Sequence, residues 1–535
     1  MTHLHSERGQ FLLALSLLIL LTAVAIIARP MTPIDETRYI SVAWEMWLRG
    51  DYLVPFKNGV PYSHKPPLMI WMYQLGWAIF GVNEWWPRMV SPLVSAGGLL
   101  LTMQLARRLW PERTGLGGSA VLVLSSSLLW TVFSTSAMFD VILAFITLIG
   151  MHGTLAAANG NERRGFAMVG LAIGLGVLAK GPVILLHLLP AAVLAPWWNP
   201  GLQWKRWFSG IGLAFLLGAM IALAWAIPAG IAGGEAYRRA IFWGQTADRM
   251  VQSFAHNRPL WWYLPILPAI FFPWLVWPGL WRSLVSFART GLDRGGRFCL
   301  AWLLPVFIAF SLISGKQPHY LIPIFPAFAL LVARSVSNEA RVSGLWLPSL
   351  SAVLAGGAFV AMASGWLKVS RDELTVPPDV LPGLLLIVVA IVVYARGRKT
   401  PQPLIAMTVL GAALSAGMQL ALIKPLYPAY DIRPMALAIK AAQESGRTVA
   451  HLGDYHDQYH FAGRLQKPLV LVERKEDLSL WLTEHPEAYV VIYSKNLKRL
   501  EGTNLIASQH YLGAAVALVD APTAKTLLLT PKAID

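Results

Sequence analysis

The chain carries the apolar run FLLALSLLILLTAVAIIA at residues 11–28, followed at once by the charged stretch RPMTPIDETR at residues 29–38. The apolar run has the length that an α-helix needs to cross a bilayer. A signal peptide is the alternative, but the only A-x-A pattern, at residues 23–25, lies inside the run, so we interpret it as an uncleaved first span. Long apolar runs and short charged connections alternate along most of the chain, which predicts a polytopic helical membrane protein.

The composition agrees with a membrane protein. Of the 535 residues, 56% are hydrophobic and only 13% are charged, so a soluble domain could not hide the apolar surface from water. The net charge of +16 does not indicate nucleic-acid binding, because Lys and Arg fall in short clusters between apolar runs, as membrane orientation signals do. Cys299 is the only cysteine, which excludes an internal disulfide, a CxxC zinc site and a thiol-pair redox site.

Apolar stretches of suitable length predict about 13 transmembrane spans. They lie near residues 10–28, 87–106, 117–134, 138–157, 166–179, 182–197, 209–232, 261–281, 298–314, 318–336, 343–366, 380–395 and 402–424. Lys and Arg gather in alternate connections, which we therefore place in the cytoplasm. The other connections, including the long loops 29–86 and 233–260, would face outward. Because the first loop faces outward, the N-terminus would be cytoplasmic, and an odd number of spans then puts the C-terminal tail outside.

The composition changes near residue 427 and indicates a second domain. Short buried strands are expected at residues 448–452, 468–472, 488–493 and 526–529, with helices at 433–444 and 476–482. A region of about 110 residues is large enough for a core of its own. The sequence therefore predicts a transmembrane domain over residues 1–426 and a compact α/β domain over residues 427–535.

The outer loop 29–86 contains the acidic pair Asp35 and Glu36 at the start of an amphipathic pattern. Apolar residues that include Trp44 and Trp47 recur at helical spacing, which predicts an interfacial helix with tryptophans at headgroup depth. Asp35 could serve only as the N-cap of this helix, or it could be a reactive carboxylate. The loop alone leaves both interpretations open.

A second short helix is expected to begin at Pro66-Pro67, because proline suits the first turn of a helix. His64 and Lys65 would stand at its N-terminal end. A cation there is unfavourable for the helix unless an anion also binds, so Lys65, Arg38 and free helix N–H groups could form a phosphate site. The alternative is that Lys65 only reaches into anionic lipid headgroups.

Further charged residues fall at the outward ends of the predicted spans. Asp140 starts the fourth span, where a carboxylate is costly unless it is paired, functional or a displaced N-cap. Lys180 and Lys316 each precede a proline-containing break on the same side, and each alone could be a snorkelling lysine. Arg249, in loop 233–260, could bind two phosphate oxygens or could be solvated loop charge. Their agreement on one side favours a functional role.

Four motifs occur in order along the chain. They are Asp35-Glu36-Thr37-Arg38, Gly59-Val60-Pro61-Tyr62-Ser63-His64-Lys65-Pro66-Pro67-Leu68, Ala179-Lys180-Gly181-Pro182 and Ser314-Gly315-Lys316-Gln317-Pro318-His319-Tyr320. Together they resemble the bacterial aminoarabinose-lipid A transferases, which are kin to the dolichyl-phosphate-mannose protein mannosyltransferases. The resemblance covers nearly the whole chain and implies a GT-C fold, an all-α membrane domain with interfacial helices and a small periplasmic α/β domain.

The resemblance implies transfer of an aminoarabinose-like sugar from undecaprenyl phosphate to a lipid A phosphate at the periplasmic face of the inner membrane. The expected partners are this donor, this acceptor and membrane lipids, and we expect a monomer without a nucleotide cofactor. A different sugar, or a protein, O-antigen or core-sugar acceptor, stays open. A transporter or flippase is disfavoured, because the charges gather at one surface and no internal repeat is visible.

The resemblance also implies roles for individual residues. Asp35 would be the leading catalytic carboxylate, Glu36 would support it, and Asp140 would be a second acidic residue at the cavity. The lipid phosphate would be bound by Arg38, Lys65 and Arg249, with Tyr320 near it. Apart from the resemblance, we also expect Lys180 and Lys316 to bind this phosphate. The family usually has glutamate in place of His64, at a position linked to a divalent metal. Histidine can bind zinc but is a poor ligand for magnesium, so the metal stays open.

The predicted C-terminal domain contains a cluster of polar residues. They are His451, Asp454, His456, Asp457 and His460. His456 and His460 could bind zinc if they lay four residues apart on a helix. We predict instead a loop with solvated polar side chains, because a strand is expected to end at Leu452.

Overall fold

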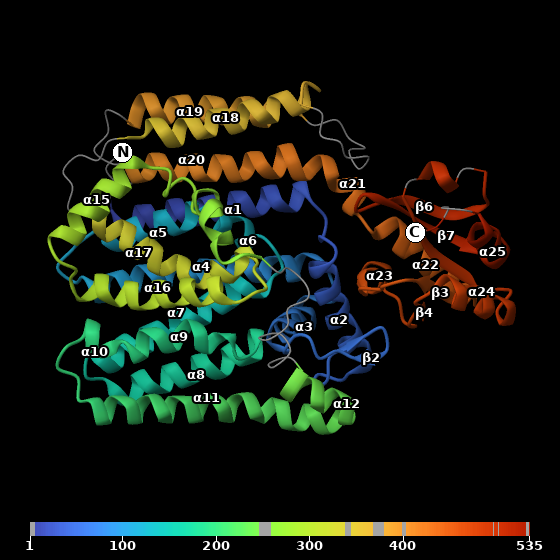
Figure 1. The fold of residues 1–535 in the computed structure, drawn as a ribbon, viewed down its shortest axis with the longest axis horizontal. Coiled ribbons are helices and arrows are strands. Elements are labelled where there is room, and N and C mark those ends of the chain that lie inside the picture. The colour runs from blue at the N-terminus through green and yellow to red at the C-terminus, as the bar shows by residue number, and fades with distance from the viewer. Residues whose placement is uncertain are drawn as a thin grey trace.

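The structure is a computed structural model that describes residues 6–244, 258–337, 344–367, 379–397, 403–495, 497–500, 502–530 and 534. Long helices lie side by side, roughly antiparallel, and form the larger body, and a small mixed domain sits at one end of them (Figure 1). The loop between the first two long helices lies between the bundle and this domain.

Apolar helices make up the bundle. They are α1 (Glu7–Ala28), α4 (Trp85–Leu109), α5 (Leu116–Ser126), α6 (Leu128–Ser134), α7 (Phe139–Ala158), α8 (Glu162–Lys180), α9 (Val183–Val193), α10 (Ala195–Trp198), α11 (Trp204–Ala232), α14 (Tyr263–Ile270), α15 (Pro278–Arg289), α16 (Arg294–Leu312), α17 (Phe325–Val336), α18 (Trp346–Ala363), α19 (Leu381–Gly397) and α20 (Pro403–Met418). Short helices α12 (Gly234–Arg239) and η4 (Pro318–Ile324) flank α11 and α17.

Each predicted span overlaps one or two of these helices, which confirms a multi-pass membrane protein. Within the described residues, eight helices are long and apolar enough to cross a membrane, or nine if the bent pair α5 and α6 is one span. Helices such as α9 and α19 are apolar but shorter. The count of 13 spans therefore stays a prediction.

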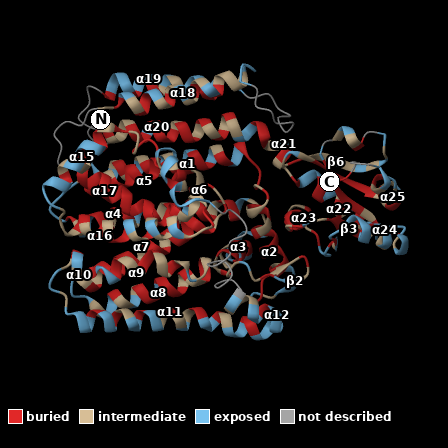
Figure 2. Cartoon of the chain, viewed as in Figure 1, coloured by how far each residue is buried: buried red, intermediate tan, exposed pale blue. Residues whose placement is uncertain are grey.

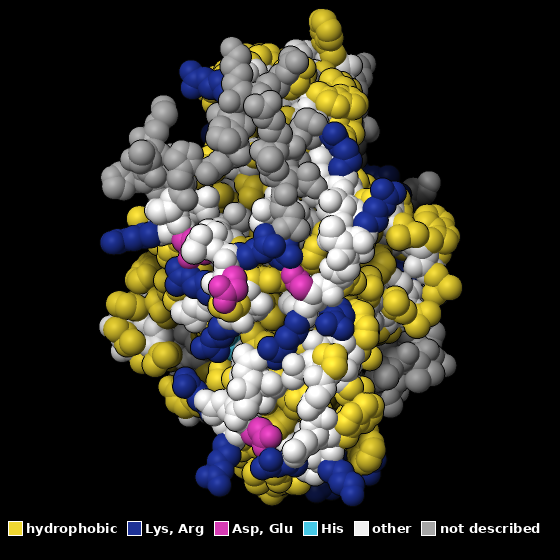
Figure 3. All heavy atoms as spheres, turned by 90° about the vertical axis from the view of Figure 1, so that its left-hand side faces the viewer, with side chains coloured by type: hydrophobic (Ala, Val, Ile, Leu, Met, Phe, Trp, Pro, Cys, Tyr) yellow, Lys and Arg dark blue, Asp and Glu magenta, His cyan; other side chains and the backbone are white. Residues whose placement is uncertain are grey.

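Burial separates the inner helices from the outer ones. Buried residues fill the interior around α5, α7 and α17, whereas α11, α18 and α19 expose much of their surface (Figure 2). The exposed residues of these outer helices are largely apolar, as a surface in contact with lipid requires. Lys and Arg side chains gather on the end of the bundle opposite the small domain (Figure 3).

The loop between α1 and α4, at residues 29–84, folds into two helices and a hairpin. Helix α2 (Asp35–Arg49) is followed by the antiparallel strands β1 (Phe56–Lys57) and β2 (Val60–Pro61) and then by α3 (Leu68–Phe80). The hairpin turn is Asn58-Gly59, with φ of 50° and 85°. Asn-Gly favours this two-residue turn, which needs positive φ at both positions. The two helices were predicted from the sequence and the hairpin was not.

The C-terminal domain is built on one five-stranded sheet with the strand order β4-β3-β5-β7-β6. Its strands are β3 (Val449–Leu452), β4 (Val470–Val472), β5 (Tyr489–Ser494), β6 (Leu505–Tyr511) and β7 (Ala514–Asp520). Its helices are α22 (Arg433–Glu444), α23 (Gln458–Gly463), α24 (Lys475–Glu484) and α25 (Ala521–Leu529). Strands β4, β3 and β5 are parallel, whereas β7 is antiparallel to both β5 and β6.

One strand prediction in this domain is wrong. Residues 526–529 lie inside α25, because Asp520 caps that helix by accepting a hydrogen bond from the Thr523 backbone N–H at 2.9 Å, and Pro522 occupies its first turn. The other three strands and both helices are confirmed within one or two residues.

Candidate active site

The carboxylate of Asp35 lies at the first residue of α2 and is not the N-cap, which is Ile34 and has no side-chain cap. Asp35 forms an ion pair with Arg38, one turn further along the helix, and accepts a hydrogen bond from the Tyr39 hydroxyl at 3.1 Å. The side chain of Asp35 is 48% exposed. The helix cap interpretation is therefore wrong. Arg38 and Tyr39 fix the position of the Asp35 carboxylate, which stays accessible to solvent.

Glu36 is buried and both of its carboxylate oxygens are occupied. One oxygen pairs with Arg29 and accepts from the Thr32 N–H at 2.7 Å, and the other accepts from the Ala137 N–H at 2.6 Å. Burial alone would raise the pKa of Glu36, but the charge of Arg29 and these hydrogen bonds outweigh it and lower the pKa. Glu36 thus ties the first loop to the start of α7 and stays ionised.

Asp140 and Lys180 form a second ion pair, buried between two long helices. Asp140 is the second residue of α7, and Lys180 is the last residue of α8. Their Nζ and Oδ1 atoms lie 2.5 Å apart, and the Asp140 side chain is 2% exposed. Lys180 also lies over the ring of Tyr320, 5.0 Å from its centroid. The Asp140 carboxylate, whose burial among apolar helices would be costly alone, is therefore paired with the Lys180 ammonium group.

The ring of Phe139 lies between the Asp35–Arg38 pair and the Asp140–Lys180 pair, because it directly precedes Asp140 and contacts Tyr39, which bonds to Asp35. The ring of Tyr39 meets it edge-on with centroids 4.8 Å apart, and Lys65 Nζ lies 5.7 Å from its centroid. His319, at the start of η4, interacts electrostatically with Asp35, Lys65, Asp140 and Lys180. Its ring also packs edge-on against Tyr320.

The structure thus brings together six of the residues singled out from the sequence. They are Asp35, Arg38, Lys65, Asp140, Lys180 and Tyr320. They converge where α2 meets the ends of α7, α8 and η4. Two carboxylates and three cations around one place can bind a phosphate and act on a group attached to it.

Of the other predicted phosphate ligands, Lys316 does not join this group. Lys316 is buried, and its Nζ donates to the main-chain oxygens of Ile313 at 2.5 Å and Arg258 at 2.9 Å, so its charge fixes the connection before η4. Arg249 lies outside the described residues, as do residues 245–257 of its loop.

His64 belongs to no cluster of three metal-binding side chains within the residues that the structure describes. Its ring packs against the ring of Tyr62, with centroids 5.3 Å apart. Among the residues that the structure describes, no three His, Cys, Asp or Glu side chains could together hold a metal ion. Protein zinc sites use three or four such ligands. A metal at His64 therefore stays a prediction.

Comparison with known proteins identifies the family. Residues 64–231 match the family model described as dolichyl-phosphate-mannose-protein mannosyltransferase. The undecaprenyl phosphate-alpha-4-amino-4-deoxy-L-arabinose arabinosyl transferase of Pseudomonas aeruginosa PAO1 is 32% identical over 399 residues, which are 72% of this chain and 71% of that protein. The chain belongs to this arabinosyl transferase family. The resemblance inferred from the four motifs is confirmed.

The extent of the match varies among the arabinosyl transferases. The relatives from Pseudomonas fluorescens and Edwardsiella ictaluri are also 32% identical, but the alignments cover 56% and 61% of their lengths. The fold match extends further. The crystal structure of ArnT from Cupriavidus metallidurans bound to undecaprenyl phosphate superposes with a TM-score of 0.73 at 19% identity, covering 98% of this chain and 99% of that chain. The whole chain thus has the fold of the arabinosyl transferases.

Sequence reasoning did not identify several residues that build the site. Arg29 follows the first span, and its guanidinium pairs with Glu36 and donates to the main-chain oxygen of Thr135 at 2.7 Å. Tyr39 and Phe139 carry no charge, so no electrostatic pattern marks them. His319 stands inside a quoted motif, and its position next to Tyr320 was the signal available.

The C-terminal domain docks on the loop between α1 and α4, which the sequence did not predict. The Trp44 indole N–H donates to the Leu465 main-chain oxygen at 3.0 Å, so Trp44 is buried against protein. The Phe461 N–H donates to Ser41 Oγ at 3.0 Å. The amide of Asn58 exchanges two hydrogen bonds with the backbone of Leu469, at 2.8 and 2.9 Å.

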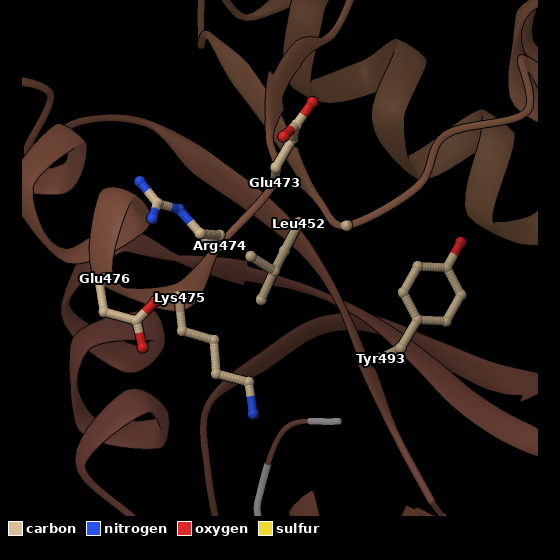
Figure 4. Close-up of a pocket in the computed structure, with 7 residues that line it drawn as sticks. Leu452, Glu473, Arg474, Lys475, Glu476 and Tyr493 are labelled. Atoms are coloured by element: carbon tan, nitrogen blue, oxygen red, sulfur yellow. The ribbon is translucent and has the colours of Figure 1, made fainter.

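The polar cluster of the C-terminal domain is only in part the solvated loop that we predicted: β3 ends at Leu452 and Asp454 is exposed, but other members are buried. His451, Asp457 and His460 are buried, and His460 Nδ1 pairs with Asp457 Oδ1 at 2.9 Å. His460 lies on α23, which packs against α2. The domain also contains a pocket between β3, β5 and the start of α24 (Figure 4). The charged side chains around this pocket point in different directions and include none of the six converging residues.

Proposed function

We propose that this protein transfers 4-amino-4-deoxy-L-arabinose from undecaprenyl phosphate to a phosphate of lipid A at the periplasmic face of the inner membrane. The observation that carries the proposal is the convergence of Asp35 and Asp140 with Arg38, Lys65 and Lys180 at one end of the membrane helices. The relatives are named for the same lipid-linked sugar, which supports this donor.

The distribution of charge supports the orientation. Lys and Arg gather on the end of the bundle opposite the C-terminal domain (Figure 3), and basic residues favour the cytoplasmic side of a membrane. The N-terminus would then be cytoplasmic and the site and the C-terminal domain periplasmic, with 13 spans in the full chain. A monomer suffices for this arrangement, because the six converging residues come from one chain.

The cations would stabilise the leaving group. As the bond between the anomeric carbon and the donor phosphate breaks, negative charge grows on that phosphate. Arg38 and Lys180 are already held by Asp35 and Asp140, so they can meet this charge without large movements. Lys65 lies on the same side, and Arg249 is proposed to join them. Preorganised charges of this kind favour the transition state over the bound substrate.

Asp35 would act on the acceptor or on the sugar. A lipid A phosphate is already a nucleophile near neutral pH, so Asp35 would orient it or stabilise positive character at the anomeric carbon. With a hydroxyl acceptor, the same carboxylate would be the general base. Glu36 has no free oxygen within the site, so its support is structural: it fixes α2 through Arg29 and Ala137.

Mass spectrometry of lipid A tests the function directly. Cells that make the protein and its lipid-linked donor are expected to contain lipid A that is heavier by one amino sugar, and cells without the protein should lack this species. An unchanged lipid A spectrum together with a new sugar on protein, core or O-antigen would contradict the proposed acceptor.

A further inference from the structure

The hairpin of the first outer loop lies against the C-terminal domain, on the side of α2 that faces away from the membrane helices (Figure 1). Lys57, the last residue of β1, donates from Nζ to the main-chain oxygen of Tyr455 at 3.2 Å. Tyr455 belongs to the connection between β3 and α23, which we call the β3–α23 connection and define as residues 453–457. This contact brings the connection to the edge of the site.

His456 belongs to this connection and follows Tyr455 directly. The imidazole is half-buried, and it interacts electrostatically with Arg38, Lys57, Asp454 and Asp35. Its backbone N–H donates to Gln458 Oε1 at 3.1 Å, which helps to fix the connection. With the described part of the chain, its ring nitrogens form no hydrogen bond.

The protonation state of His456 suits hydrogen bonding to an anion. Burial, and then the charges of Arg38 and Lys57, lower the pKa of His456. The ring is therefore neutral near pH 7 and offers one N–H as a donor. Lys57, which bonds to the residue before His456, supplies a positive charge, and two of its three N–H groups remain after the bond to Tyr455.

The proposed reaction needs two phosphate sites, one for the leaving phosphate and one for the attacking phosphate. Lys65 and Lys180 lie on the side of the membrane helices, where a donor with its lipid tail in the bilayer would place its phosphate. In a direct displacement, an acceptor phosphate oxygen bonds to the anomeric carbon while the donor phosphate leaves with the bonding electron pair. The acceptor must then approach from the opposite side of the sugar.

Lys180 ends membrane helix α8, whereas Lys57 lies on the hairpin and His456 on the C-terminal domain. We propose that Lys57 and His456 form a second anion-binding site on the far side of the sugar, which takes the phosphate of the acceptor. The inference rests on the proposed function and gives the C-terminal domain a part in acceptor recognition. Asp454 is exposed and interacts electrostatically with both residues, so its carboxylate opposes an anion here. Removing this negative charge should therefore have the opposite effect to removing the positive one.

Steady-state kinetics of the purified full chain, with lipid A and undecaprenyl phosphate-aminoarabinose varied separately, tests this site. Lys57→Gln and His456→Ala should each raise the KM for lipid A about tenfold, as loss of a charge-assisted hydrogen bond to phosphate predicts. The KM for the donor and kcat should stay within about twofold. Asp454→Asn should lower the KM for lipid A, and Lys57→Arg should restore it.

The variants separate this site from the alternatives. Glu484→Gln removes an exposed carboxylate from the same domain, and it should leave both KM values unchanged. Equal changes in both KM values for Lys57→Gln, or no change in the KM for lipid A, would overturn the proposal. A raised donor KM for Asp454→Asn would also overturn it, because the connection would then bind the cationic amino group of the sugar. A wild-type chain that transfers nothing to lipid A would contradict the proposed function itself.

Discussion

Asp35 and Glu36 are adjacent carboxylates with different surroundings, and this difference separates their roles. Asp35 is about half exposed and points to the converging cations, whereas Glu36 is buried and fully hydrogen-bonded. The sequence predicts both residues as a functional pair but not which of them is accessible. Their positions depend on Arg29 and Ala137, and the latter is 101 residues away in the chain.

Loss of the Glu36 charge should destabilise the protein. Glu36→Gln leaves the buried Arg29 without a counter-charge, which costs about 3 kcal/mol for pairs of this kind. Because the pKa of Glu36 is lowered in the folded state, its contribution is present above the usual pKa of 4.5 and is lost as pH falls through the folded value. Thermal unfolding in detergent should show a lower Tm for the variant at pH 7 and a smaller difference below pH 4.5.

The exposed Glu484→Gln provides the control for this measurement, since its Tm should match that of the wild type at every pH. A Glu36→Gln variant with the Tm of the wild type at pH 7 would show that the pair with Arg29 contributes nothing to folding.

Helix α2 is the element that links the membrane domain to the C-terminal domain. Its first turn carries Asp35, and its later turns bear Ser41 and Trp44, which bond to Phe461 and Leu465. The amphipathic pattern predicted the helix correctly. It could not show what covers the apolar face, because Leu465 follows Trp44 by 421 residues.

The wrong strand prediction in the C-terminal domain also shows what a local sequence pattern cannot decide. The run at residues 526–529 is apolar and short, and periodicity alone does not separate a strand from a buried helix. Asp520 and Pro522 before it are helix start signals that could have corrected the prediction. Asn58-Gly59 is likewise a hairpin signal that is present in the sequence.

The hydrogen-bonded contact between Asn58 and Leu469 should hold the hairpin on the C-terminal domain. Asn58→Asp keeps the acceptor for the Leu469 N–H but replaces the N–H donor with a carboxylate oxygen facing the Leu469 carbonyl. We expect a destabilisation of about 2 kcal/mol and faster limited proteolysis between the two domains. Asn504→Asp, an exposed substitution in the same domain, should have no effect. Equal proteolysis rates for the two variants would contradict this role.

At the scale of the whole molecule, the apolar runs and the clusters of Lys and Arg were enough to predict a multi-pass protein with a separate α/β tail region. Docking of the tail on the first loop could not be predicted, since it depends on single hydrogen bonds between residues about 400 positions apart. The six converging residues were recognised as separate motifs, and only the fold shows that they meet.

The orientation can be tested by cysteine labelling, because the single native cysteine, Cys299, is buried. In intact cells, a membrane-impermeant thiol reagent that crosses the outer membrane should label Glu484→Cys in the C-terminal domain. It should label Arg113→Cys, between α4 and α5, only after the inner membrane is opened. Labelling with the opposite pattern would place the site in the cytoplasm and would contradict the periplasmic assignment.

The central claim is that Asp35 acts in the transfer of an amino sugar from undecaprenyl phosphate to lipid A. The most direct measurement is mass spectrometry of lipid A after incubation with the lipid-linked donor and purified wild-type, Asp35→Asn or Asp477→Asn protein, each shown to be folded by its Tm. We predict addition of one amino sugar by the wild type and by the exposed Asp477→Asn control, and a rate at least about 100-fold lower for Asp35→Asn. Transfer by Asp35→Asn at the wild-type rate, or no transfer by the wild type, would contradict the account.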